Sequence, residues 1–215
     1  MDYTLDETYE YILDRADKKG SDMFQLPYVL NVFQTQTYDF IDEQLPYLES
    51  NQRNTQDLQQ VMLTKKINVV NDPQDNFKTN AALPEDLYHL SRVNPIFKGG
   101  VTSRRPKLIR HGNYDGMRTD PHNKPTAEYP LITQYNNYIN IDSGFNEKPI
   151  STHITYLTKP IFAKENELQE RIVNLPNGVI EAIIQKCVKE LVSSKGDQRT
   201  QAEFAKEAGA RTKRQ

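Results

Sequence analysis

The sequence predicts an α+β protein, and two patterns in the 215-residue chain lead to this class. Apolar residues recur at helical spacing near both ends of the chain, whereas the middle holds short segments rich in β-branched and aromatic residues. Pro, Gly, Asn and Asp separate these middle segments, as is typical of strands joined by turns. We therefore expect helices from both termini to pack together, with a central antiparallel β-sandwich or barrel-like region and an extended C-terminal tail.

The first helix is predicted from its cap and its apolar stripe. Thr4 to Glu7 form a capping-box pattern, in which the Thr4 hydroxyl accepts from the backbone of Glu7 and the Glu7 side chain reaches back. Apolar side chains then follow at i, i+4, i+7, i+8 and i+11, namely Leu5, Tyr9, Ile12, Leu13 and Ala16. We expect this helix to end at Gly20.

Two further helical pieces are predicted before residue 67. Pro27 suits the first turn of the second helix, and Pro46 is expected to end or kink that helix. The buried face of the second helix is predicted to consist of Leu30, Phe33, Phe40 and Ile41. The third piece is predicted within residues 51–66, because Leu58, Val61 and Met62 would share one helical face.

The region 67–162 is predicted to be an antiparallel β region. Its strand-like segments are residues 67–70, 87–93, 107–109, 138–141 and 153–157. Residues 112–130 hold several Gly and Pro and little aliphatic content, so we expect an exposed loop there. Pro149 and Pro160 bracket the last strand, since a proline cannot donate to the ladder.

The C-terminal part divides into a helix and a tail. Residues 163–194 are predicted to contain a helix that packs on the N-terminal helical segment, residues 1–66. Its apolar face is expected to consist of Val179, Ile180, Ile183, Ile184, Cys187, Val188, Leu191 and Val192. Residues 195–215 are a polar docking tail, which cannot bury enough surface to order itself alone. The side chains predicted to dock are Arg199, Phe204, Lys206, Arg211, Lys213 and Arg214.

Composition excludes several classes of protein. Apolar residues make up 36% of the chain, and Asn and Gln together number 32, so much of the surface suits contacts with partners. No apolar run reaches the length of a bilayer crossing, since Glu181 and Gln185 interrupt the longest candidate. The acidic N-terminus differs from an export signal, and Cys187 is the single cysteine. We expect a protein made in the cytoplasm, without a membrane contact.

Residues that could carry catalysis or bind a metal form no recognised pattern. The metal-ligand types His111, Asp115, Asp120 and His122 fall within twelve residues, but their spacing matches no helical pair, which favours a solvated loop. Cys187 lies on an apolar helical face, where burial makes a thiol inert. The chain has no nucleophile elbow, Walker loop or dinucleotide fingerprint. We expect neither an enzyme nor a cofactor.

Charge is unevenly distributed along the chain. Residues 1–50 carry a net charge of −8, and residues 98–118 a net charge of +5. The candidate basic patch consists of Lys98, Arg104, Arg105, Lys107 and Arg110. Such a patch can face nucleic-acid phosphates, for instance in a DNA channel, or acidic groups of a neighbouring copy, and we favour the second interpretation slightly. No base-reading motif accompanies the charge.

The order of these features resembles the neck proteins of tailed bacteriophages. The acidic helical start is followed by Ala-Leu-Pro-Glu-Asp-Leu-Tyr-His-Leu at residues 82–90, which enters the β region. Tyr129-Pro130 then lies in a loop, Thr-Tyr-Leu-Thr-Lys-Pro spans residues 155–160, and Leu175-Pro176 opens the last helix. More narrowly, this order is similar to that of ring or adaptor proteins of crAss-like phages.

The resemblance implies a structural virion protein rather than a catalyst. Such proteins form a closed ring, commonly of twelve copies, at the head-to-tail junction, where the ring extends the DNA channel and provides a platform for the tail. The implied partners are other copies of the chain, the portal protein, other neck or tail proteins and the genomic DNA that passes through. The tail would reach onto a neighbour or the portal. The alternative is a non-specific nucleic-acid-binding protein that acts through residues 98–118.

Overall fold

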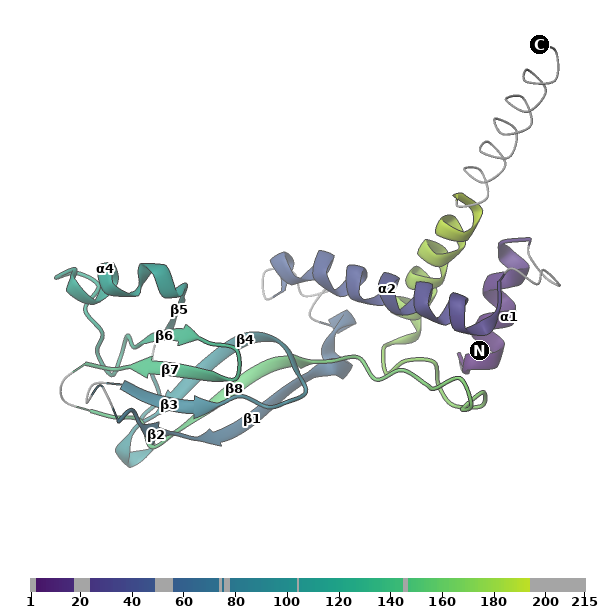
Figure 1. Cartoon of the computed structure of the whole chain (residues 1–215). Coiled ribbons are helices and arrows are strands. Elements are labelled where there is room, and N and C mark those ends of the chain that lie inside the picture. Colours follow the sequence, from purple (N-terminus) through teal and green to yellow (C-terminus); the bar gives the residue numbers. More distant parts are fainter. Residues whose placement is uncertain are drawn as a thin grey trace, which may run out of the picture. The chain divides into compact units, whose positions relative to one another are not determined.

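The computed structural model has the α+β class that the sequence predicts, and it divides into two compact units (Figure 1). One unit combines residues 1–60 and 160–215, and the other comprises residues 61–159. The structure describes residues 3–17, 24–48, 56–73, 75, 78–103, 105–144 and 147–193. The predicted tail, residues 195–215, lies outside the described residues. We call the two units the helical unit and the β unit.

Helix α1 of the helical unit spans Leu5–Arg15 and begins as its sequence predicts. The Glu7 backbone N–H donates to the Thr4 hydroxyl at 3.3 Å, which satisfies one of the free donors at the helix start. Of the predicted stripe, Leu5, Ile12, Leu13 and Ala16 are buried. The helix ends at Arg15, before the predicted end at Gly20, which lies outside the described residues.

Helix α2, Leu26–Gln44, holds Pro27 in its first turn, and a 3-10 turn, Leu45–Tyr47, follows it at Pro46. All four residues predicted for its buried face are buried. A C-terminal helix occupies residues 177–193. Its buried residues are Val179, Ile180, Ile183, Ile184, Cys187 and Leu191. Val188 is only half-buried and Val192 is 51% exposed, so the apolar face is narrower than predicted.

Side-chain contacts hold the helices from the two ends of the chain together, as the sequence predicts. The Glu181 carboxylate of the C-terminal helix accepts from the Tyr3 hydroxyl at 3.1 Å and pairs with Arg15 at 2.7 Å. Lys186 pairs with Glu43 of α2 at 2.6 Å. None of the helices within the described ranges is long and apolar enough to cross a bilayer.

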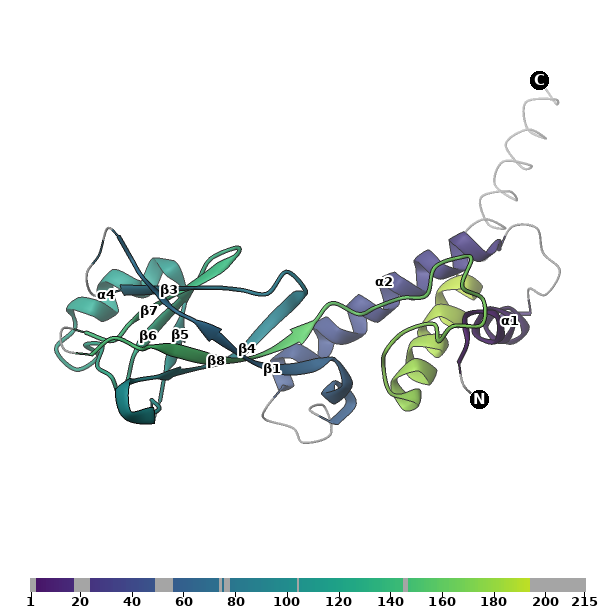
Figure 2. The same ribbon diagram turned by 90° about the horizontal axis from the view of Figure 1, so that it is seen from below.

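The β unit contains two sheets (Figure 2). The three-stranded sheet is antiparallel, in the order β1 (Met62–Asn68), β8 (Ser151–Thr158), β4 (Leu87–Ile96). The five-stranded sheet runs in the order β2 (Val70–Asn71), β3 (Lys78–Ala82), β7 (Tyr138–Asp142), β6 (Leu131–Gln134), β5 (Lys107–Ile109). Strands β5 and β6 pair in parallel, which corrects the prediction of a purely antiparallel region.

One apolar cluster fills the β unit and takes residues from both sheets. Its buried members are Ala81, Leu90, Val93, Ile132, Ile139, Ile141, Ile154 and Tyr156. Because β3, β6 and β7 contribute from one sheet and β4 and β8 from the other, the two sheets pack face to face. The sandwich form of the prediction therefore describes this unit.

Other details of the structure differ from the prediction. The third helical piece, predicted within residues 51–66, is helical at residues 56 and 57, while residues 51–55 lie outside the described residues. Its predicted face is wrong at Met62, because a 3-10 turn at Gln59–Val61 leads directly into β1. The predicted boundary between residues 66 and 67 consequently falls inside β1. Strands β3 and β6 were not predicted. The loop predicted at 112–130 contains helix α4, Tyr114–Thr119, whose first residue is buried.

Candidate functional site at strand β5

An open hollow of about 440 Å³ lies between β5 and the segment that precedes β6. Its walls come from Arg105, Lys107, Pro121, His122, Asn123, Lys124, Thr126 and Tyr129. Backbone hydrogen bonds place the two walls, since the Arg105 N–H donates to the Glu128 carbonyl at 3.1 Å and the Lys107 N–H donates to the Pro130 carbonyl at 2.9 Å. The parallel pairing of β5 with β6 therefore forms the site, which we call the cationic hollow.

Positive charge in the cationic hollow is only partly neutralised. Lys107 Nζ donates to the Asn123 side-chain oxygen at 2.7 Å, and within the described part of the chain no ion pair includes Arg105, Lys107 or Lys124. Asp120 contributes one nearby carboxylate. Its pKa is lowered because it accepts from the Asn123 side chain and the His122 backbone, and because Lys107 is close. The hollow can thus bind anionic groups.

The residues of the predicted basic patch that the structure describes do not all line the cationic hollow. Arg105 and Lys107 line the cationic hollow together. Lys98 is exposed in the turn Lys98–Gly100, and Arg110 lines a second hollow of about 710 Å³ with His111 and Tyr135, so neither belongs to the cationic hollow. Arg104 and the predicted docking residues Arg199, Phe204, Lys206, Arg211, Lys213 and Arg214 lie outside the described residues.

Two polar residues of the cationic hollow were not assigned to a binding surface by the sequence prediction. Lys124 was not assigned to any site, and His122 was considered only as a metal ligand. His122 follows Pro121, and Lys124 precedes Pro125. Two prolines this close together indicate a tight segment that folds back, and this was the signal available in the sequence. Only the parallel β5–β6 pairing shows that this segment meets Arg105.

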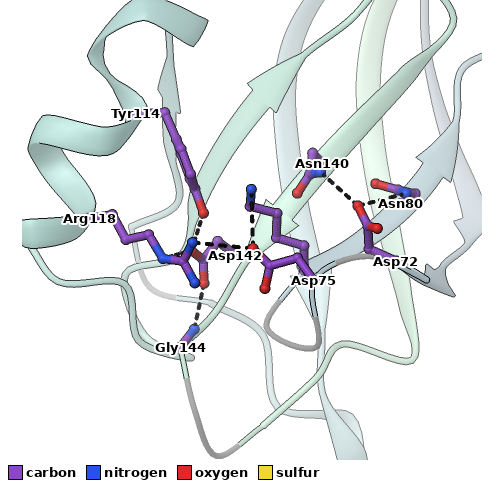
Figure 3. A network of polar contacts seen from close by, with 9 residues as sticks. Asp72, Asp75, Asn80, Tyr114, Arg118, Asn140, Asp142 and Gly144 are labelled. Atoms are coloured by element: carbon purple, nitrogen blue, oxygen red, sulfur yellow. Dashed lines mark hydrogen bonds and ion pairs between the residues drawn. The ribbon is translucent and has the colours of Figure 1, made fainter.

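A buried polar network fixes α4 to the end of β7 (Figure 3). The Asp142 carboxylate, 1% exposed, accepts from the Tyr114 hydroxyl at 2.5 Å and from the Gly144 N–H at 3.0 Å. Arg118 lies 3.6 Å from Asp142 and 3.2 Å from Asp75. Burial, and then the bond to Asp142, raise the pKa of the Tyr114 hydroxyl far above its ordinary value. This network neutralises Arg118, so its charge is not available to a ligand of the β unit.

The other residues weighed as reactive or metal-binding have structural surroundings. The His111 ring packs edge-on against Tyr135, with ring centroids 5.1 Å apart. Among the described residues, no group of three or more His, Cys, Asp or Glu side chains is arranged to hold a metal ion. Burial raises the pKa of the Cys187 thiol to about 12, which keeps it protonated and unreactive near neutral pH.

The helical unit carries the opposite charge. On α1, the carboxylates of Asp6, Glu7 and Asp14 are exposed and have no ion pair within the described ranges, and Arg15 is already paired with Glu181. Helix α2 contains no Lys or Arg. Over the whole sequence, residues 61–159 hold 13 Lys and Arg against 9 Asp and Glu, whereas residues 1–60 with 160–215 hold 14 against 20. The β unit is net positive and the helical unit net negative.

Neither a scan against protein-family models nor a search of curated proteins found a match to this chain. The arrangement described above offers an anion-binding hollow on one unit and a carboxylate-covered helix on the other, both of which are suited to association.

Proposed function

We propose that this chain is a structural subunit that joins copies of itself into a ring at the head-to-tail junction of a tailed bacteriophage. The observation that carries the proposal is the division of charge between the two units of one subunit. A closed ring needs two different, complementary surfaces on each copy, so that the same contact repeats around the axis. The positive β unit and the negative helical unit supply such a pair.

Uncovered apolar side chains on both units support association. Ile161 and Val192 of the helical unit are 71% and 51% exposed. On the β unit, Val70, Val101 and Ile150 are 70%, 61% and 60% exposed. Single exposed apolar residues are common on monomers. A large interface nevertheless buries residues of this kind in its core and surrounds them with polar contacts at its rim. The place of the ring in a virion rests on the resemblance to neck proteins.

In this role the chain acts mechanically rather than chemically. The ring would extend the DNA channel from the portal and present a platform for other neck or tail proteins. The fold suits this function because the β unit is a two-sheet sandwich with its own core, and the helical unit joins both ends of the chain.

The proposal is tested by imaging the purified full-length chain, alone and with the portal protein, by negative-stain electron microscopy. We expect closed rings with a central hole, and we expect the chain among the proteins of purified virions by mass spectrometry. A chain that stays monomeric at all concentrations, with and without the portal, and is absent from particles would refute the proposal.

The alternative, non-specific nucleic-acid binding, receives less support because only Arg105 and Lys107 of the described patch residues line the cationic hollow. Neutralising Arg104, Arg105, Lys107 and Arg110 together is expected to change affinity for duplex DNA little at physiological salt. Titration of the variant into a labelled duplex over a range of salt concentrations measures this. A large loss of affinity together with a shallower salt dependence would favour DNA binding as the main role.

A further inference from the structure

We infer that the cationic hollow of one copy binds the exposed carboxylates of α1 from a second copy. This inference rests on the proposed self-association and names the contact that directs it. The occupant is the α1 surface that presents Glu7 and Asp14. These residues are seven positions apart, which is close to two helical turns, so their side chains lie on one face of α1 about 10 Å apart along its axis.

The two surfaces match in charge and in their lack of other partners. Arg105 and Lys124 are exposed in the hollow, and Glu7 and Asp14 are exposed on α1. Within the described residues none of these four side chains forms an ion pair. A contact between copies would therefore add charge pairs without breaking an existing one. Because the hollow and the helix are different surfaces, the contact is heterologous and can close into a ring.

The composition of the hollow favours carboxylates of a protein helix over the backbone of duplex DNA. Proteins that depend on the phosphate backbone commonly make about six to ten phosphate contacts, which need a row of cations. Here Arg105, Lys107 and Lys124 surround one hollow, whereas Lys98 and Arg110 lie outside it. Tyr129, 40% exposed at the hollow, offers apolar surface beside the charges. This combination suits the exposed, carboxylate-bearing side of a helix such as α1.

Exposed charge pairs mainly set partner choice, orientation and association rate. We therefore expect the contact to determine which surfaces meet, while apolar side chains elsewhere add to the affinity. Its signature is a strong dependence of self-association on salt, since exposed charges are screened within about 10 Å at 0.1 M ionic strength.

A charge swap in the full-length chain tests the inference. The hollow variant carries Arg105→Glu and Lys124→Glu, and the helix variant carries Glu7→Lys and Asp14→Lys. Sedimentation velocity over a concentration series is expected to show self-association weakened tenfold or more in each variant. An equimolar mixture of the two variants, or one chain with all four changes, is expected to recover association to within about threefold of wild type. In both cases every contact again pairs opposite charges.

The matched control carries Lys65→Glu and Lys66→Glu, the same change in net charge at exposed positions outside the hollow. We expect it to associate like wild type, and circular dichroism checks that each variant is folded. Wild-type-like assembly of both swap variants, or no recovery in the mixture, overturns the inference and leaves the ring proposal standing. A wild-type chain that never associates overturns both. If the hollow variant keeps self-association but loses tenfold in affinity for a 30-base-pair duplex, the hollow binds phosphates and the inference is wrong.

Discussion

Replacing Tyr114 with Phe removes only the phenolic hydroxyl, and we expect this change to destabilise the β unit. The Tyr114 hydroxyl donates to Asp142 at 2.5 Å, and Asp142 is 1% exposed, so water cannot replace the lost donor without opening the site. Hydrogen bonds to charged groups contribute about 1.5–3 kcal/mol, and removing one donor leaves a buried carboxylate oxygen short of a partner. The phenyl ring keeps the packing of Tyr114, so the change reports on the hydrogen bond.

We expect a loss of about 2 kcal/mol in the free energy of unfolding, measured by urea titration followed by circular dichroism. For a unit of 60–100 residues, each kcal/mol corresponds to roughly 4–8 °C, so the melting temperature should fall by roughly 8–16 °C. The matched control is Tyr129→Phe, since Tyr129 is exposed and should change stability by less than about 0.5 kcal/mol. Equal effects of the two substitutions would contradict the assignment of the network as a stabilising contact.

The pH dependence gives a second measure of the same bond. The pKa of Tyr114 in the folded chain is raised above its ordinary value of 10.0, so folding stabilises the protonated hydroxyl. The stability that the protonated Tyr114 hydroxyl contributes is complete below pH 10, and it decreases as the pH rises toward the pKa of Tyr114 in the folded chain. The stability difference between wild type and Tyr114→Phe should therefore shrink between pH 9 and pH 11. A constant difference over that range would show that Tyr114 ionisation is not linked to folding.

Three further predictions concern other positions. Gly144→Ala should lower the free energy of unfolding by more than about 1 kcal/mol, because φ is +78° and a Cβ would lie 2.5 Å from the Pro125 carbonyl oxygen. Gly112 has open space around it, so Gly112→Ala should have little effect in the same urea titration. Thr4→Ala should cost about 1 kcal/mol through loss of the α1 cap, measured by thermal unfolding, and an unchanged melting temperature would argue against the cap. Cys187 should resist a thiol reagent at pH 8 until urea unfolds the helical unit, and rapid labelling of the folded chain would contradict its burial.

Sequence patterns predicted the helices better than the strands, for a physical reason. The stripes of α1, α2 and the C-terminal helix persist over several turns, so their period is recognisable. Strand β3, Lys-Thr-Asn-Ala-Ala, has almost none of the residues that favour strands, and it is a strand because β2 and β7 pair with it on both sides. Leu58 and Val61 are buried at helical spacing, but they belong to a turn that leads into β1.

The candidate site was predictable only in part. Clustering along the chain identified Arg105 and Lys107, but the cationic hollow also depends on Lys124, which a parallel strand pair brings close. Local sequence contains no information on which edge a three-residue strand will occupy. The same limit applies to Arg118, which the sequence counts as a free charge and which the structure places beside Asp75 and Asp142.

The division of the helical unit between the two ends of the chain has a consequence for biosynthesis. Arg15 and its partner Glu181 are 166 positions apart, and a ribosome adding roughly 5–20 residues per second needs roughly 8–33 s to join them. During this time α1 and α2 emerge without the C-terminal helix that holds them in the finished protein. The β unit is continuous in sequence and can fold while it is being translated, so we expect it to mature first, with chaperones shielding the nascent apolar stripes until the last helix is made.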